Sequence, residues 1–481
     1  MRGSSGATPT DAGPCAAEAG GAPLRKQDPL TPALSRRERE QKQKQDFLMH
    51  HIVVVGGGAA GLQLVTKLGN TLGKRGQARI TLVERARTHL WKPLLHSVAA
   101  GSIDRSQHEL NFLAQAHWHH FTYRYGELAG LDRAAKRISL AATCDDEGRE
   151  ITPATTLGYD TLVIAIGSVT NDFGTPGAAE FAVPLETPDQ ASRFNRRLVN
   201  ACLRANTQDG PVRPGQLHVA IIGAGATGTE LAAELHRTVR AVVAYGMDRI
   251  DPARDVRIVL IEAAPRILPA LPERISAATE GLLAKIGVVV RSGARVAEVR
   301  ADGVLLADGE VIPAELVVWS AGVKAPEVLR GIGVLETNRI NQLVVTPDLQ
   351  TSDPDVFAIG DCAACPLGST GGTIPPRAQA AHQQASHMIA TLRRRLKGLP
   401  AQPFVYRDFG SLVSLGRYST VGSLMGFLAG RSLFIEGYFA RMVYRSLYKM
   451  HQTALHGGTA VLWRLVARYS SQSPEPGIKL H

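Results

Sequence analysis

The sequence predicts an α/β fold with two doubly wound domains, the second inserted into the first, followed by an amphipathic helical tail. Two glycine-rich turns, in IVVVGGGAAG and VAIIGAGATG, each follow an apolar strand and open a helix. A later strand, DVFAIGD, ends in Gly-Asp, which suggests that the chain returns to complete the first domain. The 481 residues also exceed what one hydrophobic core holds.

The first turn predicts a Rossmann-type dinucleotide-binding site. Its first glycine allows a tight turn, the second lets a pyrophosphate approach the backbone, and the third lets the helix pack on the strand. The helix N-terminus would offer free N–H groups to the phosphates. The residues expected to contact the ligand are Gly56, Gly58, Ala59, Ala60 and Gly61. Glu84, which ends the next strand, would accept hydrogen bonds from the ribose hydroxyls.

The second turn predicts a second site of the same kind. Ile52–Leu68 and Val219–Leu235 align at an offset of 167 residues, which indicates an internal duplication. Glu262 ends the following strand, as Glu84 does in the first domain. The other residues expected at this site are Gly223, Gly225, Thr227, Gly228 and Gly322.

The two sites are expected to hold different dinucleotides. The longer FAD suits the first site, because Asp361 at the end of the return strand and Gly167 at the end of YDTLVIAIGS could contact it. The second site suits NADH as the mobile co-substrate. Glu262 should favour NADH over NADPH, since a carboxylate repels a 2′-phosphate, and Arg266 weakens this preference slightly.

Two further segments hold candidate catalytic residues. In PPRAQAAHQQ, a helix should start with the prolines in its first turn, with Gln379 and Gln383 on one face and small alanines around them that would admit a flat ring. A capped surface helix is the alternative for this segment. Glu230, in the first turn of the second glycine-turn helix, would either complement the helix dipole or lie beside nicotinamide and flavin.

Cysteines and histidines suggest no metal site. The five cysteines lack regular spacing, which fits a reducing compartment, and Cys362 and Cys365 are interpreted as structural thiols. The cluster of His117, His119 and His120 has no carboxylate or thiol placed to complete a site and is interpreted as surface histidines.

The two ends of the chain differ from its middle. Residues 1–48 are rich in Gly, Ala, Pro and charge and predict a disordered leader without a secretory signal, and Met49 is a candidate natural start. The first domain is expected over residues 49–182 and 326–415, the second over 183–325 and a membrane-associating tail over 416–481. That tail holds eight Lys and Arg against two Glu, so it carries +6 of the net charge of +11.

The tail predicts two short basic amphipathic helices, over Phe434–Met450 and Ala460–Tyr469. In the first, an apolar stripe that includes Met442, Ser446 and Met450 runs beside Arg441, Arg445 and Lys449. Such helices bind anionic lipid surfaces, with packing on the protein's own core or on a dimer partner as the alternative. The sequence has no run of 18 apolar residues, so no transmembrane helix is expected.

From Met49 to His481 the chain resembles the bacterial type II NADH:quinone oxidoreductases, which are glutathione-reductase-like flavoproteins. The segments that carry the resemblance are HIVVVGGGAAGLQLVTKLG, WKPLLHSVAAGSID, VAIIGAGATGTELAAEL, VFAIGDCAACP, PPRAQAAHQQA and FIEGYFARMVYRSLYKMHQTALHG with the closing IKLH. The resemblance implies that Ala378–Gln383 lies by the flavin ring, with Ala378 and Gln379 contacting FAD. It also implies that Gln379 and Gln383 flank the quinone and that Glu230 sits near the nicotinamide.

The resemblance further implies an activity and a location. A hydride would pass from NADH to FAD and two electrons on to ubiquinone or menaquinone, without proton pumping. The enzyme would be peripheral on the cytoplasmic face of the inner membrane and could form a homodimer. A sulfide:quinone oxidoreductase or another NADH-dependent flavoprotein reductase is the nearest alternative, but Cys144 and Cys202 lie in no motif for persulfide chemistry. A flavin-binding sensor with a nucleic-acid-contacting tail is remote, because no nucleic-acid motif is present and no nucleic acid is expected as a partner.

Overall fold

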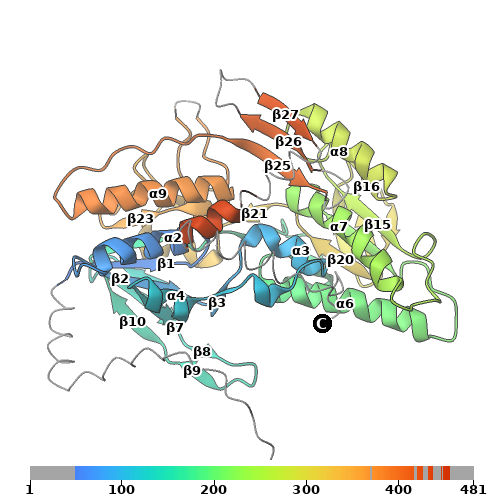
Figure 1. Ribbon diagram of the computed structural model, residues 1–481, viewed down its shortest axis with the longest axis horizontal. Helices are drawn as coiled ribbons and strands as arrows, with labels where there is room; N and C mark the ends of the chain where they lie inside the picture. The colour runs from blue at the N-terminus through green and yellow to red at the C-terminus, as the bar shows by residue number, and fades with distance from the viewer. Residues whose placement is uncertain are drawn as a thin grey trace, which may run out of the picture. The chain divides into compact units, whose positions relative to one another are not determined.

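The computed structural model describes residues 49–368, 371–415, 420–425, 432–436, 446 and 448–455 (Figure 1). For residues 421–425 and 432–436 the description covers the backbone alone. The predicted leader, the apolar stripe residue Met442 and the predicted helix Ala460–Tyr469 lie outside the described residues.

The first sheet has five parallel strands. Its order is β23 (Val356–Ala358), β11 (Thr161–Ile164), β1 (His51–Val55), β2 (Arg79–Glu84) and β5 (Thr122–Tyr125). The inner strands are continuous apolar runs because both of their faces are covered. β23 comes from the DVFAIGD segment, so the chain returns to the first sheet as the sequence predicts.

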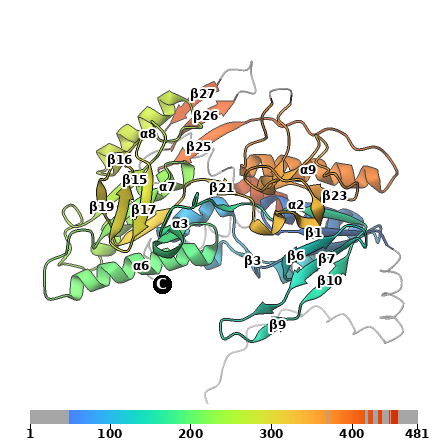
Figure 2. The same cartoon turned by 180° about the vertical axis from the view of Figure 1, so that it is seen from behind.

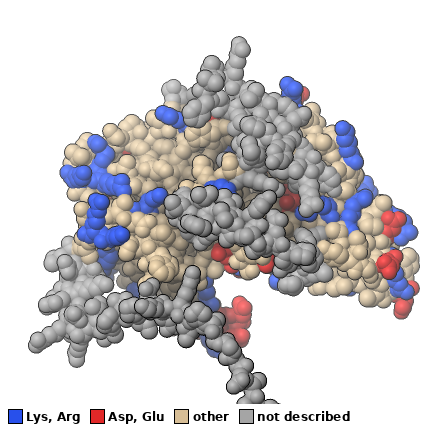
Figure 3. Space-filling view, in the orientation of Figure 1, with Lys and Arg blue, Asp and Glu red and all other residues tan. Residues whose placement is uncertain are grey.

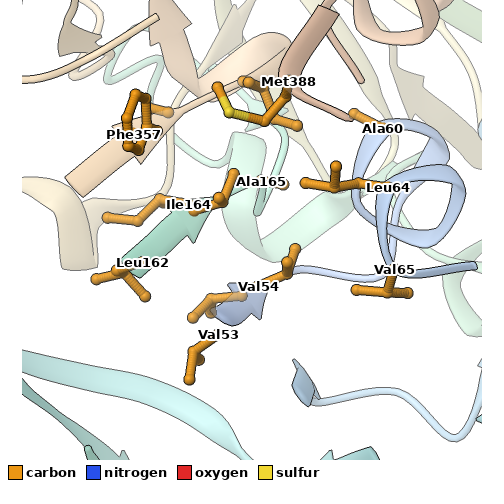
Figure 4. Close-up of a cluster of buried hydrophobic side chains, with 14 of the residues drawn as sticks. Val53, Val54, Ala60, Leu64, Val65, Leu162, Ile164, Ala165, Phe357 and Met388 are labelled. Atoms are coloured by element: carbon orange, nitrogen blue, oxygen red, sulfur yellow. The ribbon is translucent and has the colours of Figure 1, made fainter. Parts of the chain in front are cut away.

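Two helices cover one face of this sheet. They are α2 (Ala59–Leu68) and α9 (Ala378–Arg395), and the antiparallel sheet of β6 (Glu127–Asp132), β7 (Arg137–Ala141) and β10 (Thr155–Gly158) lies on the other face (Figures 1 and 2). Leu64 of α2, Met388 of α9 and Val54 of β1 are fully buried between them (Figure 4). Burial of such a side chain contributes about 1.5–3 kcal/mol, so this core holds the segments around the first glycine turn together.

The second sheet repeats the first. It also has five parallel strands, in the order β13 (Ala182–Pro184), β20 (Leu316–Trp319), β14 (His218–Ile222), β15 (Arg257–Ile261) and β16 (Val289–Arg291). It too has an antiparallel partner sheet, formed by β17 (Val296–Arg300), β18 (Gly303–Leu306) and β19 (Val311–Pro313). The duplication seen in the sequence therefore extends over the whole domain.

Further helices and short strands complete the two domains. The helices of the second domain are α5 (Ala178–Phe181), α6 (Pro188–Thr207), α7 (Ala226–Val243) and α8 (Glu273–Lys285). The remaining helical elements are η1 (Gly69–Gly73), η2 (Lys92–Leu94), α3 (Leu95–Ala99), η3 (Arg105–Gln107), α4 (Phe112–Trp118), η4 (Glu327–Leu329), η5 (Ile332–Val334) and η6 (Gly360–Cys362). The remaining short strands are β3 (Thr88–His89), β4 (Leu110–Asn111), β8 (Thr143–Cys144), β9 (Glu150–Thr152), β22 (Leu343–Val344) and β24 (Ala363–Ala364).

Two features join the domains. The strand that leads out of the first domain, β12 (Val169–Thr170), pairs with the strand that leads back, β21 (Val323–Lys324). In addition, α3 follows β2 and β3 of the first domain in the chain but buries its apolar residues in the core of the second domain, against α6 and α7. The segment that contains α3 is therefore part of the contact between the domains.

The start of the predicted tail differs from expectation. β25 (Gly410–Ser414), β26 (Thr420–Met425) and β27 (Ser432–Glu436) form an antiparallel sheet, and Phe434 pairs with Ser423 within it. The prediction that a helix begins at Phe434 is therefore wrong, because the β-forming run around Phe434 adds to the edge of β26. Ser446 and residues 448–455 are helical, so the helix extends past Met450.

Across the residues that the structure describes, no helix is long and apolar enough to span a bilayer.

Candidate functional site

The two glycine turns have the same stereochemistry. Gly56 and Gly223 adopt positive φ angles of 105° and 99°, which L side chains rarely adopt. A Cβ on Gly61 would lie 1.8 Å from the Gly56 carbonyl oxygen, and a Cβ on Gly228 would lie 2.0 Å from the Gly223 carbonyl oxygen. These glycines are therefore required by the turn itself.

The middle glycine of each turn faces open space. No atom lies within 4 Å of a Cβ placed on Gly58 or on Gly225. These residues are also the N-caps of α2 and α7, and neither helix has a side chain that caps its first N–H groups. Free N–H groups beside open space fit a pyrophosphate, as the sequence predicts for both turns. Ala59 and Ala60 open α2, and Thr227 is exposed in the first turn of α7.

Two glutamates are held next to these turns in the same way. Glu84 accepts hydrogen bonds from the backbone N–H groups of Gly57 (2.6 Å) and Ala86 (2.9 Å). Glu262 accepts them from Ala224 (2.8 Å) and Ala264 (2.9 Å). Each carboxylate is thus fixed beside its turn, where ribose hydroxyls of a bound dinucleotide would lie. The guanidinium of Arg266 donates to backbone carbonyls within residues 268–271, so its hydrogen bonds are made within its own loop.

Asp361 is linked to the ends of β11 and of the return strand. The Ser168 hydroxyl donates to Asp361 Oδ2 at 2.9 Å, and Lys92 Nζ donates to the Ser168 carbonyl at 2.9 Å. A Cβ on Gly360 would come within 4.0 Å of the Cβ atoms of both Ala60 and Ala381. The first turn, Asp361 and α9 thus meet at the carboxyl ends of parallel strands, where α/β folds bind ligands. Gly167, with φ 73° and open space around it, lies in the same stretch as Ser168.

Helix α9 begins at Ala378 with Arg377 as its N-cap, so the predicted helix is present but the prolines precede it and do not form its first turn. Its side chains have unexpected partners. The predicted alanine surface is largely used in packing, since Ala380 and Ala381 are buried. Both glutamines bind the segment 407–410. Gln379 Nε2 donates to Asp408 Oδ1 and to the Gly410 carbonyl, both at 3.0 Å, and Gln379 Oε1 accepts from the Phe409 N–H at 3.1 Å.

Gln383 repeats this pattern one turn later. Its Nε2 donates to the Arg407 carbonyl at 2.8 Å and its Oε1 accepts from the Arg407 N–H at 3.0 Å. Gln379, Gln383 and residues 407–410 are here called the glutamine clasp. A capped surface helix with solvated glutamines, the alternative left open by the sequence, does not describe this arrangement, because each amide binds the neighbouring loop at both its ends.

Glu230 is buried between three segments. Its Oε2 lies 3.3 Å from His96 Nδ1 in α3, and its Oε1 accepts a hydrogen bond from the Ser414 N–H of β25 at 2.9 Å. The side chain is 7% exposed, so the carboxylate is shielded from bulk water. Glu230 therefore does more than complement a helix dipole, since it links α7 to α3 and to the strand that precedes the tail.

Gly322 lies in the turn that follows β20 and has a φ angle of 65°. A Cβ on Gly322 would lie 2.4 Å from the Phe173 ring and would clash with it. Gly223 lies beside Ala321, and Ser320 Oγ donates to the Gly223 carbonyl at 2.9 Å. The residue before Gly322 therefore lies against the second glycine turn, although the two segments are about 100 residues apart in the chain.

The cysteines of the C-x-x-C pair are buried. Burial raises the pKa of the Cys362 thiol to about 12 and that of Cys365 to about 11. Burial likewise raises the pKa of Cys202 to about 11. These thiols are protonated at neutral pH, which suits a structural role and not nucleophilic or persulfide chemistry.

Three residues of the site were missed by sequence reasoning. Lys92 and His96 lie within WKPLLHSVAAGSID, which contributed only to the resemblance, and Ser168 follows Gly167. No local pattern identifies them, because their partners are Ser168, Glu230 and Asp361, which are distant in the chain.

Comparison with known proteins agrees with this geometry. The family profile described as pyridine nucleotide-disulphide oxidoreductase matches residues 50–385. The type II NADH:quinone oxidoreductase of Haemophilus influenzae is 41% identical over 440 residues, covering 88% of this chain and 98% of that protein. This chain belongs to the type II NADH:quinone oxidoreductases.

Another relative and two solved structures match most of this type II NADH:quinone oxidoreductase. The enzyme Ndh of Mycobacterium tuberculosis is 30% identical over 396 residues, covering 76% of this chain and 77% of that protein. The structure of NDH2 from Plasmodium falciparum in complex with NADH superimposes with a TM-score of 0.73 at 17% identity, over 89% of this chain and all of that one. The sulfide:quinone oxidoreductase of Aquifex aeolicus has the same fold, with a TM-score of 0.65 at 17% identity over 89% and 96% of the two chains.

Proposed function

We propose that this protein oxidises NADH and reduces a quinone through bound FAD. The observation that carries the proposal is the pair of matching nucleotide turns, of which the first alone is joined by Asp361 and α9. A family member in Haemophilus influenzae with 41% identity supports the choice of donor and acceptor.

The first turn would hold FAD. Gly56, Gly58 and Gly61 would accept its pyrophosphate, Glu84 its adenosine ribose and Asp361 its ribityl or phosphate region. Gly167, Ala378 and Gln379 would complete the site towards the flavin ring. When bound, FAD accepts a hydride and passes on two electrons, while the protein aligns the reactants and excludes water.

The second turn would hold NADH. Gly223, Gly225, Thr227 and Gly228 would bind the pyrophosphate and Glu262 the ribose. Glu230, with His96, would lie near the nicotinamide together with Gly322 and fix its position beside the flavin. Because α3 and β25 both bind Glu230, this carboxylate would also transmit the position of one domain to the other.

Quinone would reach the glutamine clasp from a membrane. Gln379 and Gln383 would orient its carbonyl groups, either directly or through the loop that they hold. Lys and Arg side chains gather over the end of α9, whose last turn holds Arg393, Arg394 and Arg395 (Figure 3). Such a surface attracts anionic lipid, and with the basic tail it supports peripheral binding at the cytoplasmic face of the inner membrane.

This arrangement has further consequences. The two electrons would reduce the quinone without translocation of protons across the bilayer, since the proposed sites all lie in the nucleotide domains and at the lipid surface. A homodimer would be compatible with the same mode of binding. Neither ubiquinone nor menaquinone is favoured by the described residues.

The test compares donors and acceptors. Purified protein is assayed for NADH oxidation with and without ubiquinone-1, with NADPH in parallel and Glu262→Gln as a variant. We expect fast quinone-dependent oxidation of NADH by the wild type. Glu262→Gln should raise kcat/KM for NADPH about tenfold, or ~1.4 kcal/mol, because the charge facing the 2′-phosphate is removed.

Two results would contradict the proposal. Flavin reduction by NADH without acceleration by quinone would remove the quinone site and leave the two nucleotide sites intact. A preference for NADPH in the wild type would show that Glu262 does not face the adenosine ribose. Asp308→Asn, an exposed carboxylate in the turn before β19, controls for general effects of lost negative charge.

A further inference from the structure

The described part of the C-terminal helix, residues 448–455, docks on the first domain through one face. His451 and Leu455 are each 2% exposed, and Leu455 joins the apolar core beneath α2 and α9. Met450, on the other side of the same helix, is 54% exposed. Of the predicted apolar stripe, Ser446 and Met450 lie within the described residues, and both are exposed, on the side of the helix away from the domain that holds it.

The inner face ends in a group of rings. The His451 ring stacks on Trp91, with centroids 5.5 Å apart and planes inclined by 14°. Its centroid lies 5.3 Å from that of His89 and 5.1 Å from that of His382. We call His89, Trp91, His382 and His451 the histidine clamp. Tyr448 adds a second contact, since its ring lies 5.4 Å from Trp91.

Hydrogen bonds fix the protons of the clamp. His89 Nδ1 lies 2.9 Å from the Gly57 carbonyl, which can only accept, so this nitrogen carries hydrogen. In neutral His89 the other nitrogen is then an acceptor, and His451 Nε2 at 3.1 Å must donate to it. His451 thus donates to His89, and His89 donates to the Gly57 carbonyl, so two successive hydrogen bonds connect the tail to the backbone of the first glycine turn.

The third imidazole is fixed in the same manner. Gln63 Nε2 donates to Ser386 Oγ at 2.9 Å, so Gln63 Oε1 is left to accept from His382 Nδ1. His382 lies on α9 between the two glutamines of the clasp. His451 therefore contacts the helix that carries the proposed quinone site through His382. Through His89 it is linked to the first glycine turn, which carries the proposed FAD site.

Buried histidines hold the tail helix less stably than leucines of similar volume would. Burial of imidazoles costs free energy, most of all where a nitrogen is left without a partner among the described residues, as His382 Nε2 is, whereas leucines would bury the same area without this cost. Paired polar groups have one good geometry, so they fix the orientation of the helix in a way that apolar packing does not. The arrangement favours a requirement for position over one for stability.

We propose that the histidine clamp is a positioning device which holds the lipid-facing tail helix against the quinone helix α9, so that quinone passes from the bilayer into the site. The proposal rests on the proposed function. Met450 would lie in the lipid surface, while His451 sets its distance from Gln379 and Gln383. The clamp residues need not touch quinone or flavin.

The experiment compares two quinones in anionic phosphatidylglycerol-containing vesicles. His451→Leu keeps the apolar volume but removes the donor to His89, and His451→Gln restores an N–H donor. We expect His451→Leu to reduce NADH:ubiquinone-10 activity in vesicles about tenfold, or ~1.4 kcal/mol, with activity towards water-soluble ubiquinone-1 changed less than about twofold. Ferricyanide reduction, flavin content and sedimentation with vesicles should stay at the wild-type level.

A matched control is present on the surface. His117 and Trp118 form an exposed ring pair with centroids 5.0 Å apart, so His117→Leu removes the same kind of contact outside the clamp and should change none of these activities. His451→Gln should recover most of the ubiquinone-10 activity.

Three outcomes overturn the proposal. Parallel loss of both quinone activities and ferricyanide reduction would mean that the clamp only supports the fold. Unchanged ubiquinone-10 activity would mean that tail orientation does not matter. Lost sedimentation with vesicles would mean that His451 acts on membrane binding itself. A wild type that reduces neither quinone would instead refute the proposed function.

Discussion

Neighbouring glycines of the first turn do different work. Gly61 is required by the protein, because a Cβ there would lie 1.8 Å from the Gly56 carbonyl oxygen. Gly58 is required only by a ligand, because a Cβ there would meet no protein atom within 4 Å. The same residue type thus serves the fold at one position and cofactor binding at another.

This difference predicts opposite behaviour of two alanine variants. Gly61→Ala should destabilise the fold by ~1–3 kcal/mol, the usual cost of overpacking, and lower Tm. Gly58→Ala should leave Tm of the flavin-free protein nearly unchanged and weaken FAD binding about tenfold, because the methyl group occupies the space of the pyrophosphate. Calorimetry and titration with FAD measure both effects. Equal loss of Tm in the two variants would contradict this assignment.

Sequence reasoning located the residues that build the two turns. Glycines at fixed spacing and a terminal glutamate are local, so Gly56, Gly223, Glu84 and Glu262 could be found from the sequence alone. Lys92 and His96 could not be found, because each binds a residue from another part of the chain. Long-range pairing of polar groups leaves no period in the sequence.

At the scale of elements, α9 gives the clearest case. The presence of a helix near Pro375-Pro376 was predictable from the helix-start pattern, and the shared face of its glutamines from their spacing, whereas its exact start at Ala378 was not. Their binding to residues 407–410 was not predictable, since that segment has no helical or strand period. The tail shows the opposite error, in which a helical stripe extended into a segment that pairs as β27.

The glutamine clasp predicts a selective loss of activity. Gln379→Ala removes three hydrogen bonds to the loop and should lower quinone reduction about tenfold while NADH:ferricyanide activity falls less than twofold. Gln402→Ala, in the exposed part of the same loop, is the control. Equal losses with both acceptors would remove the quinone role from Gln379.

At the scale of the molecule, the duplicated architecture followed from the sequence, and the path of the chain between the domains did not. The repeat of 167 residues predicts two similar domains, and the return strand predicts an insertion. The burial of α3 in the second domain's core has no counterpart in the repeat. Contacts between domains depend on both surfaces at once, so neither half of the sequence indicates them.

Docking of the tail helix should depend on pH. Burial lowers the pKa of His89 to about 4, assisted by positive charge on His382 and opposed by the Gly57 carbonyl, and burial lowers the pKa of His382 to about 4. His451 is the other titratable group in contact with both. Since imidazole has a pKa of about 6.5 when exposed, the undocked state binds more protons between these values.

Docking is therefore at full strength above pH 6.5 and weakens as the pH falls towards 4, by up to ~3 kcal/mol for His89 alone. Limited proteolysis of the tail and Trp91 fluorescence, from pH 7.5 down to 4.5, measure the effect. His89→Leu should flatten part of the fluorescence profile, because it removes one of the two imidazoles that titrate. Cleavage that does not rise as the pH falls would contradict neutral, buried imidazoles.

The return segment predicts that the two nucleotide turns release their ligands at different rates. Over the first turn, Gly360 and Ala381 approach Ala60, so a ligand held there is retained by a part of the chain that folds back from beyond the second domain. Its release would require this long-range contact to open, and the off-rate would be slow. A co-substrate has to depart in every catalytic cycle. The return of the chain to β23 would therefore give one of two duplicated domains a tightly retained ligand, and leave the other with a ligand that exchanges in each cycle.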